Sequence, residues 1–86
     1  MQVIVVYTGL LQLEMRKSEE TFELEPGASL GDLLELIRAK GVDFAGYFAV
    51  VEPPGQRASS VPLQEAKSTV LAPKSRVTFV YRFAGG

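Results

Sequence analysis

Both ends of the chain carry a segment typical of a β-strand buried inside a sheet. Residues 3–8 read Val-Ile-Val-Val-Tyr-Thr, which places β-branched and apolar side chains on both faces of an extended segment. Residues 76–82 alternate, with Val77 and Phe79 on one face and Val80 on the other. A strand that is apolar on both faces must be covered on both, so each of these segments is expected inside the sheet. If they lie side by side, the first and last strands form its centre.

The residues after the first strand are expected to complete a hairpin. Gly9 breaks the strand, and residues 11–15 are interpreted as a continuing ribbon before a polar turn at 16–18. Residues 21–25 alternate strictly, with Phe22 and Leu24 inward and the intervening glutamates outward. This pattern predicts a second strand, antiparallel to the first and ended by a turn at Pro26-Gly27.

A helix is predicted over residues 30–40. Ser29 is a suitable N-cap, and Asp32 stands three residues later, close to a capping box. Gly41 is expected to end the helix. One apolar stripe at i, i+3, i+4 and i+7 predicts that the helix packs against the sheet, and it comprises Leu30, Leu33, Leu34 and Ile37.

The second half of the chain predicts the remaining strands. Residues 47–51 read as a third strand, 52–60 as a polar loop, 61–63 as a segment that folds back and 69–71 as a short strand. A turn at 72–75 leads into the last strand. This order predicts an α+β domain spanning residues 1–86, with a mixed sheet of four to five strands and one main helix on one face. With the end strands adjacent, the arrangement is the ubiquitin-like β-grasp fold, followed by a flexible tail at 83–86.

Composition limits the chemistry that the domain can perform. The 86-residue sequence contains no cysteine and no histidine, so the usual ligands of zinc, haem and iron–sulfur clusters are missing, as are a thiol nucleophile and an imidazole base. The formal net charge is −1 and no basic stripe is present, which argues against nucleic acid as a partner. Residues 1–6 lack the features of a signal peptide or membrane span, so we expect a cytoplasmic protein without membrane contact.

No internal motif suggests an active site. The acidic pairs Glu19-Glu20 and Glu23/Glu25 could in principle serve in acid–base chemistry, but they decorate or flank a strand and are interpreted as solvated charges. The glycines are scattered and form no phosphate-binding loop. We expect no bound metal or cofactor.

The sequence ends in Gly85-Gly86, directly after the last strand. Two glycines contribute nothing to packing and are costly to order, whereas a tail without Cβ atoms can thread a narrow channel in a partner enzyme. The α-carboxylate of Gly86 is therefore the candidate reactive group. An ionised carboxylate can attack the α-phosphate of ATP when a partner supplies Mg²⁺ and cationic groups.

Docking of such a partner requires an exposed surface. Since both faces of the last strand are apolar, we expect a hydrophobic patch on the sheet face without the helix. The sequence leaves open whether that face carries Phe79 and Tyr81 or Val80. The candidate partner-binding residues lie at the end of the last strand and in the tail: Phe79, Val80, Tyr81, Arg82, Phe83 and Ala84.

Three features together resemble the MoaD/ThiS family of sulfur carriers, which serve molybdopterin and thiamin biosynthesis. They are the strand–strand–helix order, the helix start at residues 27–34, and the closing Val77-Thr78-Phe79-Val80 with Ala84-Gly85-Gly86. The resemblance implies that an E1-like adenylyltransferase uses ATP to adenylate Gly86, which becomes a thiocarboxylate. It further implies a larger molybdopterin synthase subunit, or another sulfur acceptor enzyme, as the second partner. The protein would be a co-substrate and not an enzyme.

The sequence departs from the family where partners would touch. Val51-Glu52 replaces a frequent Val-Asn, Ala72-Pro73-Lys74-Ser75 replaces an acidic turn, and Tyr81-Arg82 replaces Pro-Pro. Two alternatives share the activation step: a thiamin-thiazole sulfur carrier, and a ubiquitin-like modifier conjugated through Gly86. A third is a β-grasp interaction subunit in which the glycines are inert.

Overall fold

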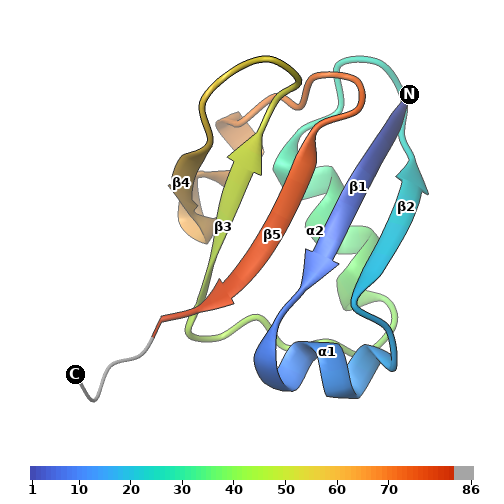
Figure 1. The fold of residues 1–86 in the computed structure, drawn as a ribbon, viewed down its shortest axis with the longest axis vertical. Helices are drawn as coiled ribbons and strands as arrows, with labels where there is room; N and C mark the ends of the chain where they lie inside the picture. Colours follow the sequence, from blue (N-terminus) through green and yellow to red (C-terminus); the bar gives the residue numbers. More distant parts are fainter. Residues whose placement is uncertain (83–86) are drawn as a thin grey trace.

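The architecture is a five-stranded sheet with one helix across one face and a second, short helix at one end (Figure 1). A computed structural model describes residues 1–82. Along the chain, the elements are β1 (Gln2–Tyr7), α1 (Gly9–Met15), β2 (Glu19–Glu23), α2 (Leu30–Arg38), β3 (Tyr47–Glu52), β4 (Ser59–Pro62), a 3₁₀ helix η1 (Leu63–Ser68) and β5 (Arg76–Tyr81).

The two end strands pair with each other inside the sheet. The strand order is β2-β1-β5-β3-β4, with β1 and β5 parallel and the other neighbours antiparallel. Val5 lies opposite Val77, and Tyr7 lies opposite Phe79. All four side chains are almost completely buried. The predicted α+β fold with a mixed sheet and central end strands is confirmed.

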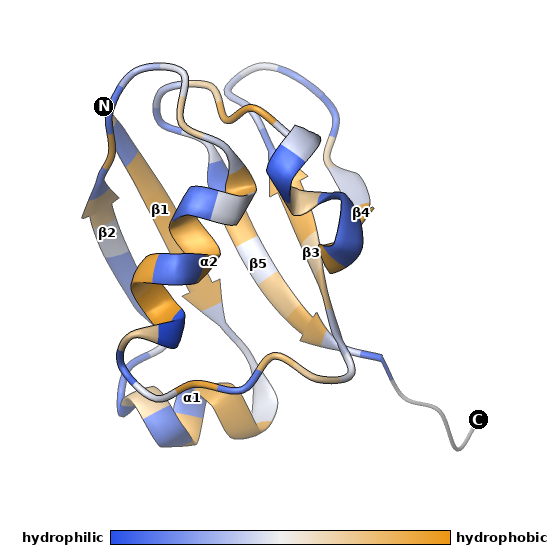
Figure 2. Ribbon diagram, turned by 180° about the vertical axis from the view of Figure 1, so that it is seen from behind, coloured by the Kyte–Doolittle hydropathy of each residue, from blue (hydrophilic) through white to orange (hydrophobic). Residues whose placement is uncertain are grey.

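Helix α2 forms as the sequence predicts. The Ser29 hydroxyl accepts a hydrogen bond from the Asp32 amide at 3.2 Å, and the Asp32 carboxylate accepts one from the Ser29 amide at 2.9 Å. This reciprocal capping box satisfies backbone donors that the first helical turn leaves free. The four residues of the apolar stripe are buried. Figure 2 shows α2 lying across the sheet. The helix ends at Arg38, and Gly41 adopts φ +92° in the turn that follows.

Helix α1 replaces the ribbon expected at residues 11–15, so that prediction was wrong. A ribbon would place Leu11 and Leu13 on one face, whereas the helix buries Leu11 alone and leaves Leu13 exposed. Met15, one helical turn after Leu11, packs partly against the core. The hydroxyl of Thr8 donates to the Phe79 carbonyl at 2.7 Å, which ties the end of β1 to β5 where the chain turns away.

Two further boundaries differ from the sequence prediction. Strand β2 begins at Glu19, two residues before the expected start, although Phe22 and Leu24 still lie inward. Strand β4 occupies part of the predicted loop, because Ser59–Pro62 pairs antiparallel with β3 as an edge strand whose outer side tolerates polar residues. The strand expected at 69–71 is wrong: it is reduced to one bridge between Ser29 and Val70.

No helix within residues 1–82 has the length and apolar character needed to cross a membrane.

A buried tyrosine and a glutamate link the sheet to the end of α2. The Tyr7 hydroxyl donates to one Glu20 oxygen at 2.9 Å, and Lys40 donates to the other at 2.7 Å. Burial raises the pKa of Tyr7, and its hydrogen bond to Glu20 raises it further. Burial also favours the neutral form of Glu20, but the hydrogen bonds from Lys40 and Tyr7 outweigh it and lower the pKa of Glu20.

We predict that this network makes stability depend on pH in the acidic range. Because the folded pKa of Glu20 lies below its unfolded value, the stabilisation is complete above the ordinary glutamate pKa of about 4.3 and disappears as pH falls through the folded pKa. Urea unfolding between neutral and strongly acidic pH measures it. Glu20→Gln should flatten part of the acid limb of the curve. An identical pH dependence in both proteins would contradict the assignment.

Candidate functional site

The predicted partner-binding residues that the structure describes lie in the second half of β5 or directly after it. Phe79 is completely buried and packs against Phe44, with ring centroids 4.7 Å apart. The structure therefore removes Phe79 from the candidate surface, because its face of β5 is the one covered by α2. Val80 lies on the opposite, open face. Phe83, Ala84, Gly85 and Gly86 lie outside the described residues.

The open face of the sheet carries an apolar patch. Its side chains come from alternate positions on neighbouring strands; Phe48 lies opposite Val80, for example, and Val50 opposite Thr78. Each is partly exposed. We call this set the open-face patch: Ile4 and Val6 of β1, Phe48 and Val50 of β3, Pro62 of β4, and Thr78 and Val80 of β5. An exposed apolar patch of this kind is typical of a protein-binding surface.

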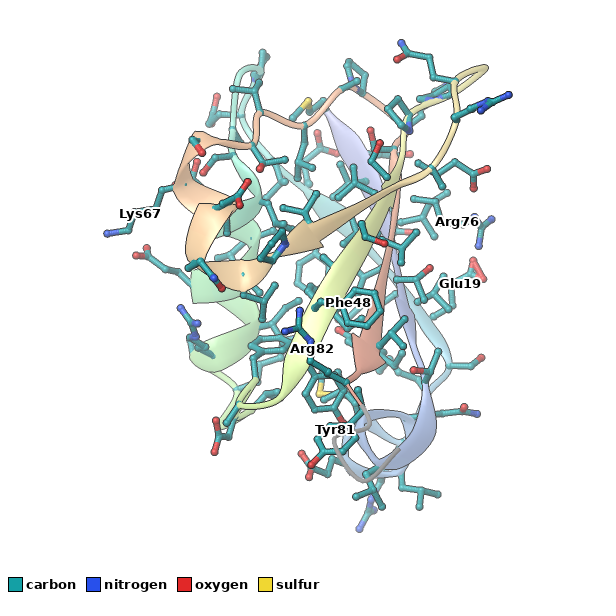
Figure 3. All side chains as sticks on the ribbon, turned by 90° about the vertical axis from the view of Figure 1, so that its left-hand side faces the viewer. Glu19, Phe48, Lys67, Arg76, Tyr81 and Arg82 are labelled. Atoms are coloured by element: carbon teal, nitrogen blue, oxygen red, sulfur yellow. The ribbon has the colours of Figure 1, made fainter. Side chains whose placement is uncertain are left out.

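Charged side chains border the open-face patch at two corners (Figure 3). The guanidinium of Arg82 lies over the Phe48 ring, 5.9 Å from its centroid. At the other end of β5, Arg76 forms a salt bridge with Glu19, with 3.7 Å between its Nη1 and Oε1 of the glutamate. Polar groups around an apolar centre resemble the usual anatomy of a protein interface.

The last residues before the tail are fixed to the loop that precedes β3. The Arg82 amide donates to the Gly46 carbonyl at 2.6 Å, and the Tyr81 ring packs edge-on against Tyr47 with centroids 5.2 Å apart. Gly46 adopts φ +84°, and a Cβ at this position would lie 2.8 Å from Cε1 of Tyr81. The positive φ therefore favours glycine at this position, and a Cβ there would also force the Tyr81 ring to shift. No sequence motif marks Gly46, since its neighbours Ala45 and Tyr47 form no turn signal.

The carboxylates weighed as acid–base candidates lie on β2 or shortly after it. No group of three or more histidine, cysteine, aspartate or glutamate side chains that could hold a metal ion occurs in residues 1–82. Glu20 is held by Tyr7 and Lys40, and Glu23 pairs with the N-terminal ammonium group at 2.7 Å. The carboxylates considered as acid–base candidates thus have structural partners or face solvent.

Comparisons with known proteins establish the fold class. No protein-family model matches the sequence, and no curated protein matches it. Among solved structures, the crystal structure of SAMP1 from Haloferax volcanii superposes with a TM-score of 0.68 at 13% sequence identity, covering 100% of both chains. The protein therefore has the ubiquitin-like β-grasp fold. The resemblance to the MoaD/ThiS family stays a prediction.

We predict that Gly46→Ala destabilises the domain more than Gly41→Ala does. Both glycines have positive φ, so both substitutions introduce backbone strain of about 1 kcal/mol. Of the two, only Gly46 would also place the new methyl group where the Tyr81 ring must shift to make room. Urea denaturation should show the difference.

A double-mutant cycle isolates the collision. In a Tyr81→Ala background, the ring is absent, so Gly46→Ala should then cost no more than Gly41→Ala. If the excess cost of Gly46→Ala persists without the Tyr81 ring, the close approach is not its cause.

Proposed function

We propose that the protein is a ubiquitin-like sulfur carrier whose Gly86 α-carboxylate is adenylated by an E1-like enzyme and converted to a thiocarboxylate. The observation that carries the proposal is the course of the last strand. Strand β5 is a central strand of a β-grasp sheet, ends at Tyr81, and is followed within a few residues by Ala84-Gly85-Gly86.

The chemistry requires only an ionised carboxylate from this chain. A C-terminal carboxyl group has a pKa of about 3.3–3.7, so it is ionised at neutral pH. One oxygen attacks the α-phosphate of ATP and pyrophosphate leaves, with Mg²⁺ and cationic groups of the partner stabilising the phosphate charge. A sulfide-equivalent nucleophile then attacks the acyl carbon and AMP leaves. The product is a thiocarboxylate, which can donate its sulfur to an acceptor.

In this proposal the folded domain provides the surface that the activating enzyme binds. The open-face patch offers the activating enzyme an apolar surface, with Val80 on it and Arg82 over Phe48 at its edge. The hydrogen bond from the Arg82 amide to the Gly46 carbonyl and the packing of Tyr81 on Tyr47 hold the chain where the tail begins. Gly85 keeps the tail narrow at the reacting carbonyl, because it has no Cβ. In this proposal the chain acts as a co-substrate of the activating enzyme.

The pathway that we favour is molybdopterin biosynthesis, with a larger synthase subunit as the sulfur-accepting partner. The long segment between β3 and β5 supports this branch. A thiamin-thiazole carrier and a ubiquitin-like modifier share the activation chemistry and differ in the acceptor that attacks the activated Gly86.

Removal of Gly85-Gly86 should abolish activation. We expect ATP–pyrophosphate exchange with the activating enzyme for the full chain and only background exchange for the truncated one, because the attacking carboxylate would be misplaced. With a sulfur donor, the intact mass of the full chain should increase by the replacement of one oxygen by sulfur.

A matched control adds uncleavable residues after Gly86 and leaves the domain unchanged. Equal activity of this extended chain in cells would show that the carboxylate of Gly86 is not the reactive group. A ladder of protein conjugates that requires Gly85-Gly86 would instead favour the modifier. Normal cellular function after the truncation would favour an interaction subunit with inert glycines.

Val80→Asp should weaken docking of the activating enzyme. A carboxylate at the centre of an apolar interface must be desolvated, so we expect the KM for the carrier to rise about tenfold while kcat changes little. Leu36→Asp is the control, since Leu36 is also exposed but lies on α2, on the other side of the sheet. Thermal unfolding checks that both variants fold. Equal KM values for the two variants would exclude the open-face patch as the docking surface.

A further inference from the structure

Helix α1 exposes two leucines that the core does not use. Leu10 and Leu13 are 69% and 72% exposed, whereas Leu11 between them is buried. The two exposed side chains are three residues apart and therefore share one face of the helix. The two leucines therefore lie largely outside the core of the domain, and such apolar exposure is typical of a contact surface.

The exposed face of α1 lies at the end of the domain from which the tail departs. Because β1 and β5 are parallel, the carboxyl ends of both strands lie at the same edge of the sheet. Helix α1 begins two residues after β1, and Thr8 is hydrogen-bonded to Phe79 of β5. Figure 1 shows α1 and the carboxyl end of β5 at this edge. Tyr81, 55% exposed, adds a third apolar side chain there.

The length of the tail limits how far the activating site can be from this edge. Four residues follow Arg82 and, fully extended, they span at most about 14 Å. The catalytic site that receives Gly86 must therefore approach Arg82 within that distance. A specific interface of ordinary size covers about 800 Å² of each partner, or a patch roughly 28 Å across. The two shorter extents of the domain are 25 and 21 Å, so a patch of that size spans this end.

We propose that Leu10 and Leu13 form a second docking element for the activating enzyme, which covers the end of the domain with an apolar surface of its own. This inference rests on the proposed function and adds to it a contact outside the open-face patch. The leucines act by holding the enzyme where the short tail can reach its catalytic site, so they are positioning residues.

The test is steady-state adenylation by the activating enzyme, with the full-length carrier as the varied substrate. We expect Leu10→Asp/Leu13→Asp to raise the KM for the carrier at least about tenfold, because the charges would enter an apolar contact. The kcat should remain near that of the unsubstituted protein. Val70→Asp is the matched control, since Val70 is 67% exposed but lies before the amino end of β5, at the opposite edge of the sheet, and should leave KM unchanged.

The outcomes separate the inference from the function on which it rests. If the unsubstituted chain is adenylated through Gly86 but the double aspartate variant has an unchanged KM, the α1 contact is wrong and the proposed function stands. If the unsubstituted chain is not adenylated at all, both fail. A dimer of the unsubstituted chain in solution that becomes monomeric in the double variant, with KM unchanged, would assign the leucines to self-association. Thermal unfolding and size-exclusion chromatography accompany the assay.

Discussion

The parallel pairing of β1 with β5 is the constraint on which the rest of the structure depends. It joins the two ends of the chain in the middle of the sheet, where Val5 faces Val77 and Tyr7 faces Phe79. Helix α2 can then cover one face of this pair while the other face stays open. The same pairing brings α1 and the end of β5 to one edge. The fold thereby connects a central strand of the sheet directly to the C-terminal segment.

Sequence reasoning predicted the elements whose patterns depend on burial. The apolar run of β1 is short and rich in β-branched residues, which favours a buried strand, while β5 alternates and α2 has a capped stripe at helical spacing. The predictions were wrong for elements whose structure depends on contacts with distant parts of the chain. Helix α1 and a ribbon would both bury Leu11, and nothing local distinguishes them. Strand β4 is polar because it lies at a sheet edge, so only its pairing with β3 reveals it.

The candidate site was predictable in part. The glycines of the tail and the location on β5 came from the sequence, but the open face could not be chosen without knowing which side α2 covers. The packing of α2 on one face of the sheet buries Phe79 and leaves Val80 partly exposed on the other. The role of Gly46 was not predicted, because it arises from the proximity of Tyr81, thirty-five positions later in the chain. Contacts between residues this distant in sequence leave no local pattern.

The most direct measurement of the central claim is top-down mass spectrometry of the protein isolated from its own cells. The account predicts a chain that ends at Gly86 and a fraction in which sulfur replaces one oxygen, with fragmentation placing the sulfur on the terminal residue. A chain that continues beyond Gly86 in every molecule, or sulfur bound at any other residue, would contradict it.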